Sequence, residues 1–433
     1  MKKYTTIYSF FLFLLGLSSI SLVYGQENKL KKADESYEHL NYVNAQKVYL
    51  EVAEKGYQSE ELFTKLGNSY YFNAQYDQAV KWYENLFALN ANPEDPIILL
   101  RYSQSLKAVG QSDKSVEYYN SYVSLNGPQT NLKTAIDYEK LIQENSGRYD
   151  INAVDYIYDE NKISFGYFKS GNTLYYASTE DSKSFANKRS AWDGLSFLSL
   201  YTLEVDSVNQ AVGTAKKLKG KLQSKFHESS PVFTADNKTM YFTRSNLTSA
   251  NKKNDQKLKI YKSEFKDGKW QEAEDLSIND DLYSNAHPAL SADGTKLYFS
   301  SDRPGGYGES DIYVSQINTD GSIGEPVNLG RKINTPGKET FPFISDQNEL
   351  YFSSDGHYGL GGLDVFYVKI LNDGFGNLIN IGAPINSYAD DFAFGIDLET
   401  HRGFISSNRT DKEGKFVYDN IYSFIETSPI IDV

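Results

Sequence analysis

The sequence predicts an α+β multidomain fold, in which an α-solenoid precedes an all-β propeller with five blades. Two observations lead to this fold class. Before residue 146 the chain repeats a helical-hairpin pattern, and after residue 147 it repeats a pair of short strands, as in Pro288-Ala289-Leu290 followed by Leu297-Tyr298-Phe299. A short-strand unit that contains a turn and recurs several times is typical of propeller blades.

The helical part, residues 26–146, has the spacing of tetratricopeptide repeats. Its complete copy places small residues where two helices cross and tyrosines beside them: Leu66-Gly67, Tyr70, Tyr76, Ala79, Tyr83 and Leu86. In the preceding copy Ala45 stands 34 positions before Ala79, which is the period of this repeat. Such hairpins stack because none can bury its apolar face alone, and they form binding surfaces. The alternative is an ordinary helical bundle.

A weaker third copy is predicted around Gly110, Ser115 and Tyr119. Residues 131–146 are then predicted to form a capping helix. The apolar residues expected to face one side of this helix are Leu132, Ala135, Ile136, Leu141 and Ile142.

From Tyr149 onward apolar residues alternate with a period of two, which indicates strands. Five strands with apolar, mostly aromatic centres mark five blades within residues 147–426: Leu174-Tyr175-Tyr176, Met240-Tyr241-Phe242, Leu297-Tyr298-Phe299, Leu350-Tyr351-Phe352 and Gly403-Phe404-Ile405. The fifth unit ends after its third strand, near Phe424. We therefore expect Asp150–Val154 to serve as its outer strand and to close the ring.

A polar segment follows three of the central strands. Ser300-Ser301-Asp302-Arg303 returns as Ser353-Ser354-Asp355 and as Ser406-Ser407-Asn408-Arg409. Serine and aspartate side chains at such places bond nearby backbone groups, so we expect a turn. The alternative is a ligand-facing loop or a cation site at one rim.

Residues 1–25 are predicted to be a signal peptide. Lys2-Lys3 precede the apolar stretch Phe10–Leu17, and small residues near Gly25 predict cleavage after that glycine. The alternative is an uncleaved membrane anchor. The chain has no cysteine, which excludes disulfides, thiolate metal sites and a lipoprotein anchor. Its net charge of −13 argues against a nucleic-acid partner.

The string Ser300–Tyr313 resembles the WD40-like propeller repeat of TolB-type periplasmic proteins. An export signal, tetratricopeptide repeats and this propeller, in that order, resemble the OmpA-family periplasmic proteins of Bacteroidota, including those of the PorE type. The resemblance implies a periplasmic protein held at the outer membrane by a PorP/SprF-type barrel of the type 9 secretion or gliding machinery.

In that family an OmpA-like peptidoglycan-binding module follows the propeller. Residues 427–433 are predicted to be a tail or a linker to such a module, which is absent from this sequence. Attachment to peptidoglycan would therefore depend on residues beyond Val433.

No catalytic, cofactor-binding or metal-binding residue is predicted. None of the five histidines shows metal-ligand spacing on a helix, and the glycines from Gly356 to Gly362 precede a strand, as in a turn between blade strands. Asp280-Asp281 and Asp390-Asp391 are expected to be solvated loop charges, although a glycosidase pair is an alternative.

The sequence thus predicts a non-enzymatic scaffold that binds proteins. A periplasmic glycan- or peptide-binding module is the main alternative, and a propeller hydrolase is a third. The partner-binding surface is not defined by the sequence; candidate rim residues are Trp192, Trp270, Arg303 and His357.

Overall fold

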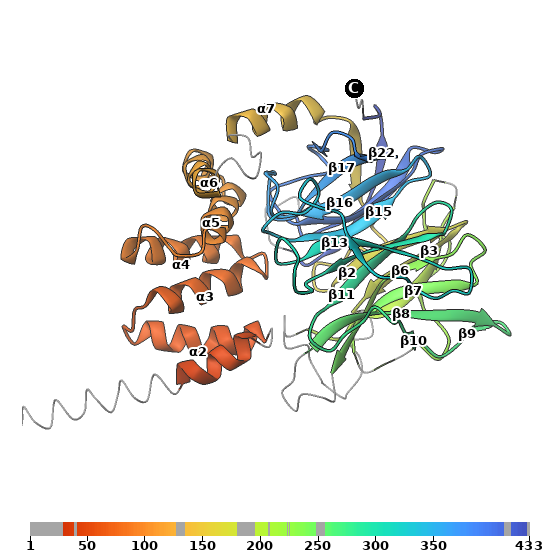
Figure 1. Ribbon diagram of the computed structural model, residues 1–433, viewed down its shortest axis with the longest axis horizontal. Coiled ribbons are helices and arrows are strands. Elements are labelled where there is room, and N and C mark those ends of the chain that lie inside the picture. Colours follow the sequence, from red (N-terminus) through yellow and green to blue (C-terminus); the bar gives the residue numbers. More distant parts are fainter. Residues whose placement is uncertain are drawn as a thin grey trace, which may run out of the picture.

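The computed structural model describes residues 29–38, 41–126, 135–179, 195–206, 208–222, 224, 226–247, 256–410 and 417–430. A stack of helices lies on one side and a β-propeller on the other (Figure 1). The predicted fold class is confirmed, including the number of blades. The predicted signal peptide, its cleavage site and Trp192 lie outside the described residues.

The helices pair as antiparallel hairpins. Their bounds are α2 (Tyr42–Glu54), α3 (Glu60–Tyr71), α4 (Tyr76–Leu89), α5 (Ile97–Ala108), α6 (Ser112–Asn126) and α7 (Ala135–Asn145). Ser59 caps α3 by accepting a hydrogen bond from Leu62 N at 3.1 Å, and Glu60 and Glu61 face the positive end of that helix. Within the described helices, none is both long and apolar enough to cross a bilayer.

Gly67 explains how closely α3 and α4 approach each other. A Cβ atom at this position would lie 2.4 Å from the ring of Tyr83, so a larger residue would push the helices apart. The Tyr83 hydroxyl then donates to Asn68 Oδ1 at 2.7 Å. The prediction that a small residue stands at the helix crossing, with a tyrosine beside it, is confirmed.

The third helical pair is also confirmed, since Ser115 and Tyr119 are buried in α6. The predicted apolar face of the capping helix is partly wrong. In α7, Ala135 and Ile142 are buried, but Ile136 is 69% exposed and Leu141 is 37% exposed. These two residues point away from the neighbouring helix because only one narrow stripe of α7 contacts it.

Each blade is an antiparallel sheet that runs outward from the axis. The first two blades comprise β2 (Ser164–Ser170), β3 (Thr173–Ser178), β4 (Ser199–Glu204) and β5 (Lys216–Lys217), then β6 (Glu228–Phe233), β7 (Thr239–Leu247), β8 (Gln256–Lys266), β9 (Lys269–Trp270) and β10 (Glu274–Asp275). The third and fourth comprise β11 (Asn285–Leu290), β12 (Lys296–Ser301), β13 (Asp311–Gln316) and β14 (Val327–Asn328), then β15 (Glu339–Ile344), β16 (Glu349–Ser354), β17 (Asp364–Leu371), β18 (Gly374–Phe375) and β19 (Ile379–Asn380).

The fifth blade contains strands from both ends of the propeller. It comprises β20 (Asp391–Asp397), β21 (Arg402–Ser407), β22 (Asn420–Glu426) and, as its outer strand, β1 (Tyr149–Ala153). The ladder between β1 and β22 runs from Tyr149 opposite Glu426 to Ala153 opposite Tyr422. The predicted closure is therefore confirmed, with the strand beginning one residue earlier than expected.

The core of the propeller is divided into clusters that lie between neighbouring blades. Five apolar clusters each combine residues of two adjacent blades; in one, Leu174 of blade 1 joins Phe404 and Ile421 of blade 5. The predicted aromatic centres of the second strands supply these clusters. Because each blade buries both faces against its neighbours, the ring must be closed for all five clusters to form.

The closing strand supports a direct prediction. Tyr149 is 3% exposed and its ring packs at 5.4 Å from Phe424, whereas its neighbour Asp150 points to solvent. Tyr149→Ala should lower the free energy of unfolding by about 3 kcal/mol, because a large buried ring is lost. Asp150→Ala, on the other face of the same strand, should change it by less than about 0.5 kcal/mol.

Urea unfolding of the full chain measures both variants. Equal effects of the two substitutions would contradict a closing role for the buried face of β1.

Candidate functional site

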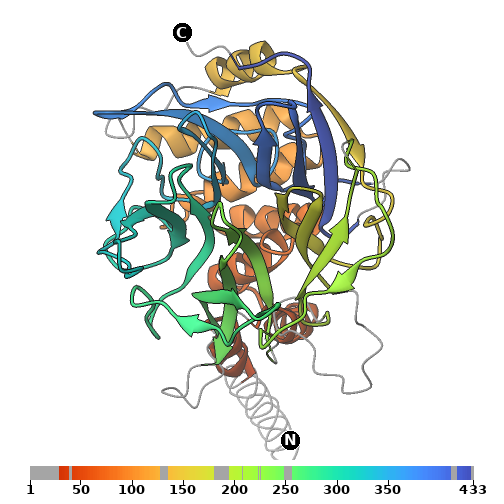
Figure 2. The ribbon, with the colours of Figure 1, turned by 90° about the vertical axis from the view of Figure 1, so that its right-hand side faces the viewer.

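A cavity of about 880 Å³ lies at the centre of the propeller and is the candidate functional site; we call it the central funnel. All five blades line it with the later part of their innermost strands, β2, β6, β11, β15 and β20, and with the hairpins that follow. Figure 2 looks onto the propeller with the helices behind it.

The register of the blades places the mouth of the funnel away from the helices. In blade 4, Glu339 at the start of β15 pairs with Ser354, next to the loop that contacts the helices. Ile344 at the other end of β15 pairs with Leu350, and the hairpin beyond them lines the funnel. A six-residue strand separates these ends by about 20 Å. The funnel and the helices therefore use opposite faces.

Every innermost strand is bent toward the axis by a β-bulge. One residue of each bulge has a positive φ: Gly166 (65°), Ser230 (48°), His287 (55°), Phe341 (48°) and Ala393 (51°). Such angles are unfavourable for residues other than glycine, so the surrounding ring must hold them in place. The five residues occupy the same position in the five blades.

The bottom of the funnel is aromatic. The rings of His287 and Phe341 stack with their centroids 3.6 Å apart, and Phe392 lies 4.8 Å from Phe341. Desolvation lowers the pKa of His287 to about 3, so its imidazole is neutral. His287 Nδ1 lies 2.6 Å from Thr340 Oγ1, and no carboxylate is bonded to the ring among the described residues.

The mouth of the funnel is acidic. Asp236, Asp293, Asp346 and Asp397, from four different blades, are exposed in the hairpins. Asp293 accepts hydrogen bonds from Ser291 and Thr295, which lower its pKa to about 2. Asp236 has a lowered pKa for the same reason, with Thr234 as the main donor. The carboxylates of Asp236 and Asp293 are therefore charged at neutral pH.

The opposite face of the propeller is joined to the helices by buried polar contacts. Tyr71 Oη donates to Asp355 Oδ2 at 3.1 Å, and Gln104 Nε2 donates to the Asp355 carbonyl. Tyr76 Oη donates to Asp390 Oδ1 at 2.6 Å. Hydroxyl and amide donors from the repeats thus add hydrogen bonds to acceptors of the propeller at this interface.

The glycine-rich loop between β16 and β17 fits against the helices. Lys107 Nζ donates to Gly359 O at 2.9 Å and to Tyr358 Oη at 2.8 Å, and the Tyr358 ring lies 4.4 Å from that of Tyr119. A Cβ at Gly362 would lie 1.9 Å from Tyr76 Oη. The predicted turn is confirmed, and its glycines allow the close approach of the helices.

The repeated polar segments form the predicted turns. Ser301 Oγ accepts from Arg303 N, Ser354 Oγ from Gly356 N, and Ser407 Oγ from Arg409 N, at 3.0–3.3 Å. The next residue holds the start of the innermost strand, as Asp355 Oδ1 does by accepting from Lys338 N at 2.6 Å. Over the described residues no group of three metal-ligating side chains occurs.

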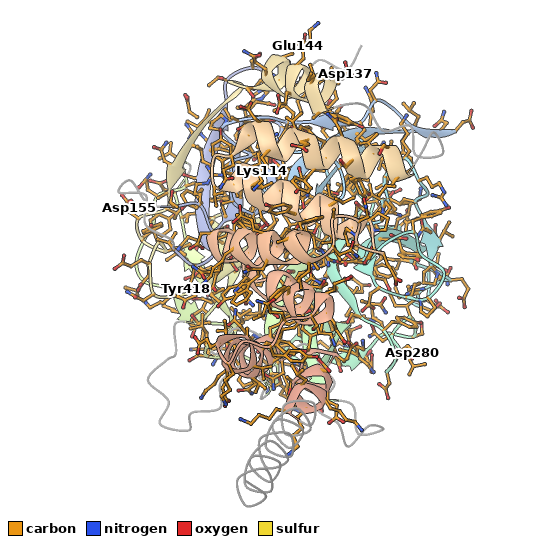
Figure 3. All side chains as sticks on the ribbon, turned by 90° about the vertical axis from the view of Figure 1, so that its left-hand side faces the viewer. Lys114, Asp137, Glu144, Asp155, Asp280 and Tyr418 are labelled. Carbon is orange, nitrogen blue, oxygen red and sulfur yellow. The ribbon has the colours of Figure 1, made fainter. Side chains whose placement is uncertain are left out.

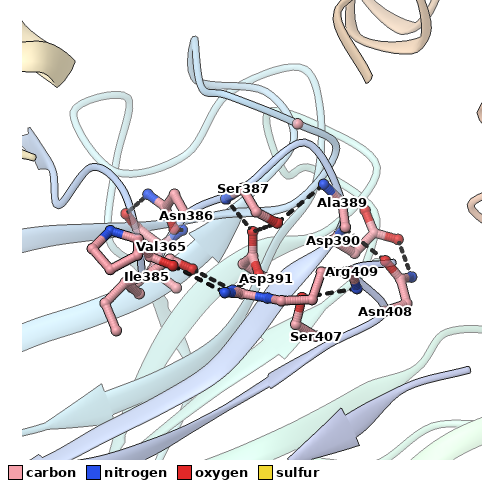
Figure 4. Close-up of polar contacts among 12 residues, drawn as sticks. Val365, Ile385, Asn386, Ser387, Ala389, Asp390, Asp391, Ser407, Asn408 and Arg409 are labelled. Carbon is pink, nitrogen blue, oxygen red and sulfur yellow. Dashed lines mark hydrogen bonds and ion pairs between the residues drawn. The ribbon is translucent and has the colours of Figure 1, made fainter. Parts of the chain in front are cut away.

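Arg303 belongs to a repeated structural position. Its guanidinium lies over Phe299 and Tyr313, 5.4 and 4.8 Å from their centroids, and bonds Asn285 Oδ1 at 3.0 Å. Arg244 and Arg409 make the same kind of contact in blades 2 and 5. Figure 4 shows Arg409 reaching Asp391 and the Ile385 carbonyl.

His357 fills this position in blade 4. Its ring packs between Phe352 and Phe366, and Nε2 lies 2.7 Å from the Ile333 carbonyl. Burial lowers the pKa of His357 to about 4, so it is neutral. In the same blade, desolvation raises the pKa of the buried Glu339 carboxyl to about 8.

The remaining candidates do not assemble into a site. Trp270 is 4% exposed and packs 5.5 Å from Phe233, so it offers no surface to a ligand. Asp281 pairs with Lys259 at 2.8 Å, as expected of a loop charge. The expectation for Asp390-Asp391 was wrong: Asp391 is buried and bonded by Arg409, and the partly buried Asp390 is bonded by Tyr76. No motif in the sequence indicates that the funnel aspartates lie together.

Comparisons with known proteins agree with this architecture. Residues 60–93 match the tetratricopeptide repeat family, and no curated protein matches the sequence. Among solved structures, a TolB-like protein from Agrobacterium tumefaciens is 13% identical, with a TM-score of 0.37, and the match covers 65% of this chain and 98% of that one. The chain combines a tetratricopeptide repeat with a five-bladed β-propeller.

Two enzymes also resemble the chain. An α-L-arabinofuranosidase from Lactobacillus brevis is 11% identical over 65% of this chain and 99% of that one, with a TM-score of 0.39. A puromycin-hydrolyzing peptidase from Mycobacterium tuberculosis is 12% identical over 64% of this chain and 53% of that one, with a TM-score of 0.35. The prediction that the chain is not an enzyme is corrected, because hydrolases are among the solved structures that resemble the chain.

The close approach at Gly362 predicts the effect of one added methyl group. Gly362→Ala should lower the free energy of unfolding by about 1–3 kcal/mol, because the Cβ overlaps Tyr76 and Asp390. Gly324→Ala is the matched control, since its Cβ would meet the nearest atom at 3.4 Å. Urea unfolding followed by fluorescence compares the two, and equal stabilities would show that the loop does not press on the helices.

Glu339 predicts a dependence of stability on pH. Its pKa of about 8 in the folded protein exceeds its ordinary value of 4.5, so the folded state holds a proton that the unfolded state releases. Its contribution to stability is therefore complete below about pH 4.5 and is lost as the pH rises through about 8. Glu339→Gln should reduce the fall in melting temperature between about pH 5.5 and about pH 8.5. Glu325→Gln is the control, and an unchanged fall in the Glu339 variant would contradict the assignment.

Proposed function

We propose that the protein is a periplasmic scaffold that binds an outer-membrane β-barrel of the PorP/SprF type, in the type 9 secretion or gliding machinery. A module beyond residue 433 would link this assembly to the cell wall. The OmpA-family resemblance of the sequence motivates the choice of partner and compartment. The structural support is the rigid joining of two interaction domains.

The observation that carries the proposal is the burial of α5 against the propeller. Arg101, Gln104 and Lys107 of this helix are 5–7% exposed, and all three bond propeller residues. A buried charge of this kind is stable only with its partner in place, so the two domains act as one body. A preformed surface loses little conformational entropy on binding, which suits a scaffold.

Two surfaces remain available for partners. The outer side of the helical stack carries polar side chains, among them Lys114, Asp137 and Glu144 (Figure 3). The funnel mouth lies on the far face of the propeller. The alternative of a glycan-binding module that uses Trp192 or Trp270 is not better supported, because Trp270 is buried.

Affinity capture tests the proposal. The chain from Gln26 onward, immobilised through its C-terminus, should recover an outer-membrane β-barrel protein from a detergent-solubilised envelope of the native host. An unrelated periplasmic protein of similar net charge serves as the control bait. Recovery of no outer-membrane protein, or of the same proteins by both baits, would contradict the scaffold function.

A further inference from the structure

We propose that the central funnel binds an extended segment of a partner protein, in which an apolar side chain is flanked by lysine or arginine residues. The proposal rests on the proposed function only in taking the partner to be a protein. It is carried by the charge, the hydrogen-bonding groups and the shape of the funnel.

The charge of the lining favours a cationic ligand. The charged side chains that line the funnel are Lys169, Arg402 and four aspartates: Asp236, Asp293, Asp346 and Asp397. All four carboxylates are exposed at the mouth. Negative charges gathered at the entrance of a concave site raise the local concentration of cations and repel anions.

At five positions of the lining the backbone N–H group is missing or already bonded. Pro231, Pro288 and Pro342 follow the bulges of three blades and carry no N–H group. The N–H groups of Gly166 and His287 are already bonded to hydroxyls of neighbouring blades, at 3.2 and 2.8 Å. Each innermost strand pairs on one side only, so unpaired carbonyl oxygens and N–H groups of its free edge face the axis. Ammonium and guanidinium groups, which only donate, can bond these carbonyl oxygens.

One buried hydroxyl has no partner. Ser230 is 9% exposed, lines the funnel near its axis, and its Oγ has no hydrogen-bond partner among the described residues. It lies beside Gly166, whose Cβ would approach Ser230 Oγ to 3.0 Å. A buried polar atom without a partner is costly, so this hydroxyl is an unmet hydrogen-bonding group beside the funnel.

The bottom and walls accept an apolar side chain. Phe341 and the neutral His287 form the floor, and Phe343 and Phe394 lie on the walls. A volume of about 880 Å³ falls in the range of small-ligand sites and admits a few side chains rather than a folded domain.

Fluorescence anisotropy with the full chain tests the proposal. The probe is a fluorescein-labelled peptide with one phenylalanine between two pairs of lysines. It should bind, with an affinity that falls as salt increases, and a peptide with glutamates in place of the lysines should not bind. Absence of binding, equal binding of the glutamate peptide, or displacement of the probe by maltohexaose would overturn the proposal.

Substitutions locate the binding. The quadruple variant Asp236→Asn, Asp293→Asn, Asp346→Asn and Asp397→Asn keeps an oxygen for each turn but removes the charge, and should weaken binding about tenfold or more. Ala235→Arg with Ala292→Arg places cations at exposed positions of the mouth and should also weaken it. The control is Asp280→Asn with Asp320→Asn, which are turn aspartates outside the funnel (Figure 3 labels Asp280). Equal affinities of the quadruple and control variants would refute a site in the funnel.

Affinity capture with the quadruple variant separates the two proposals. If this variant and the unsubstituted chain recover the same barrel protein equally well, the funnel proposal fails and the scaffold stands. If the lysine peptide binds as expected but no outer-membrane protein is recovered, the scaffold fails and the funnel site stands.

Discussion

The pairing of β1 with β22 is the interaction on which the rest of the structure depends. Every blade interface needs two blades, so an open ring would leave the apolar faces of blades 1 and 5 in water. The same strand ties the helices to the ring, because α7 ends at Asn145 and β1 begins at Tyr149. In the short connection, Gly147 N donates to Ala383 O at 2.7 Å. One ladder thus fixes the core, the funnel and the placement of the helices.

Much of this fold was predictable from the sequence, because it depends on local and repeated patterns. The aromatic centres of the second strands recur in each blade, and the small residues Gly67 and Ala79 mark a helix crossing. The closing strand was also predictable, since the fifth unit lacked its outer strand. In these cases the types of the residues determine how the elements pack.

The domain interface and the funnel were not predictable in this way. Tyr71 and Asp355 are 284 positions apart, and no sequence pattern around either residue indicates that the two are in contact. The bulge residues share a positive φ but not a side-chain chemistry. Glycine, histidine and phenylalanine occupy the same position in different blades, so the residue types do not identify it. Asp390 and Asp391 look like loop charges until Tyr76 and Arg409 are brought beside them.

The closing ladder also determines how the propeller carries mechanical load. Tyr149 and Glu426, where the chain enters and leaves the ring, are direct partners in the ladder, and Thr427 N bonds Arg148 O just beyond them at 2.8 Å. Tension applied through the segments on either side would therefore cross from one strand to its neighbour without passing through the other four blades. The ring is shielded from stretching, and the ladder would open from this end one pair at a time. A partner held in the funnel would keep its binding surface intact while the chain around the propeller is under tension.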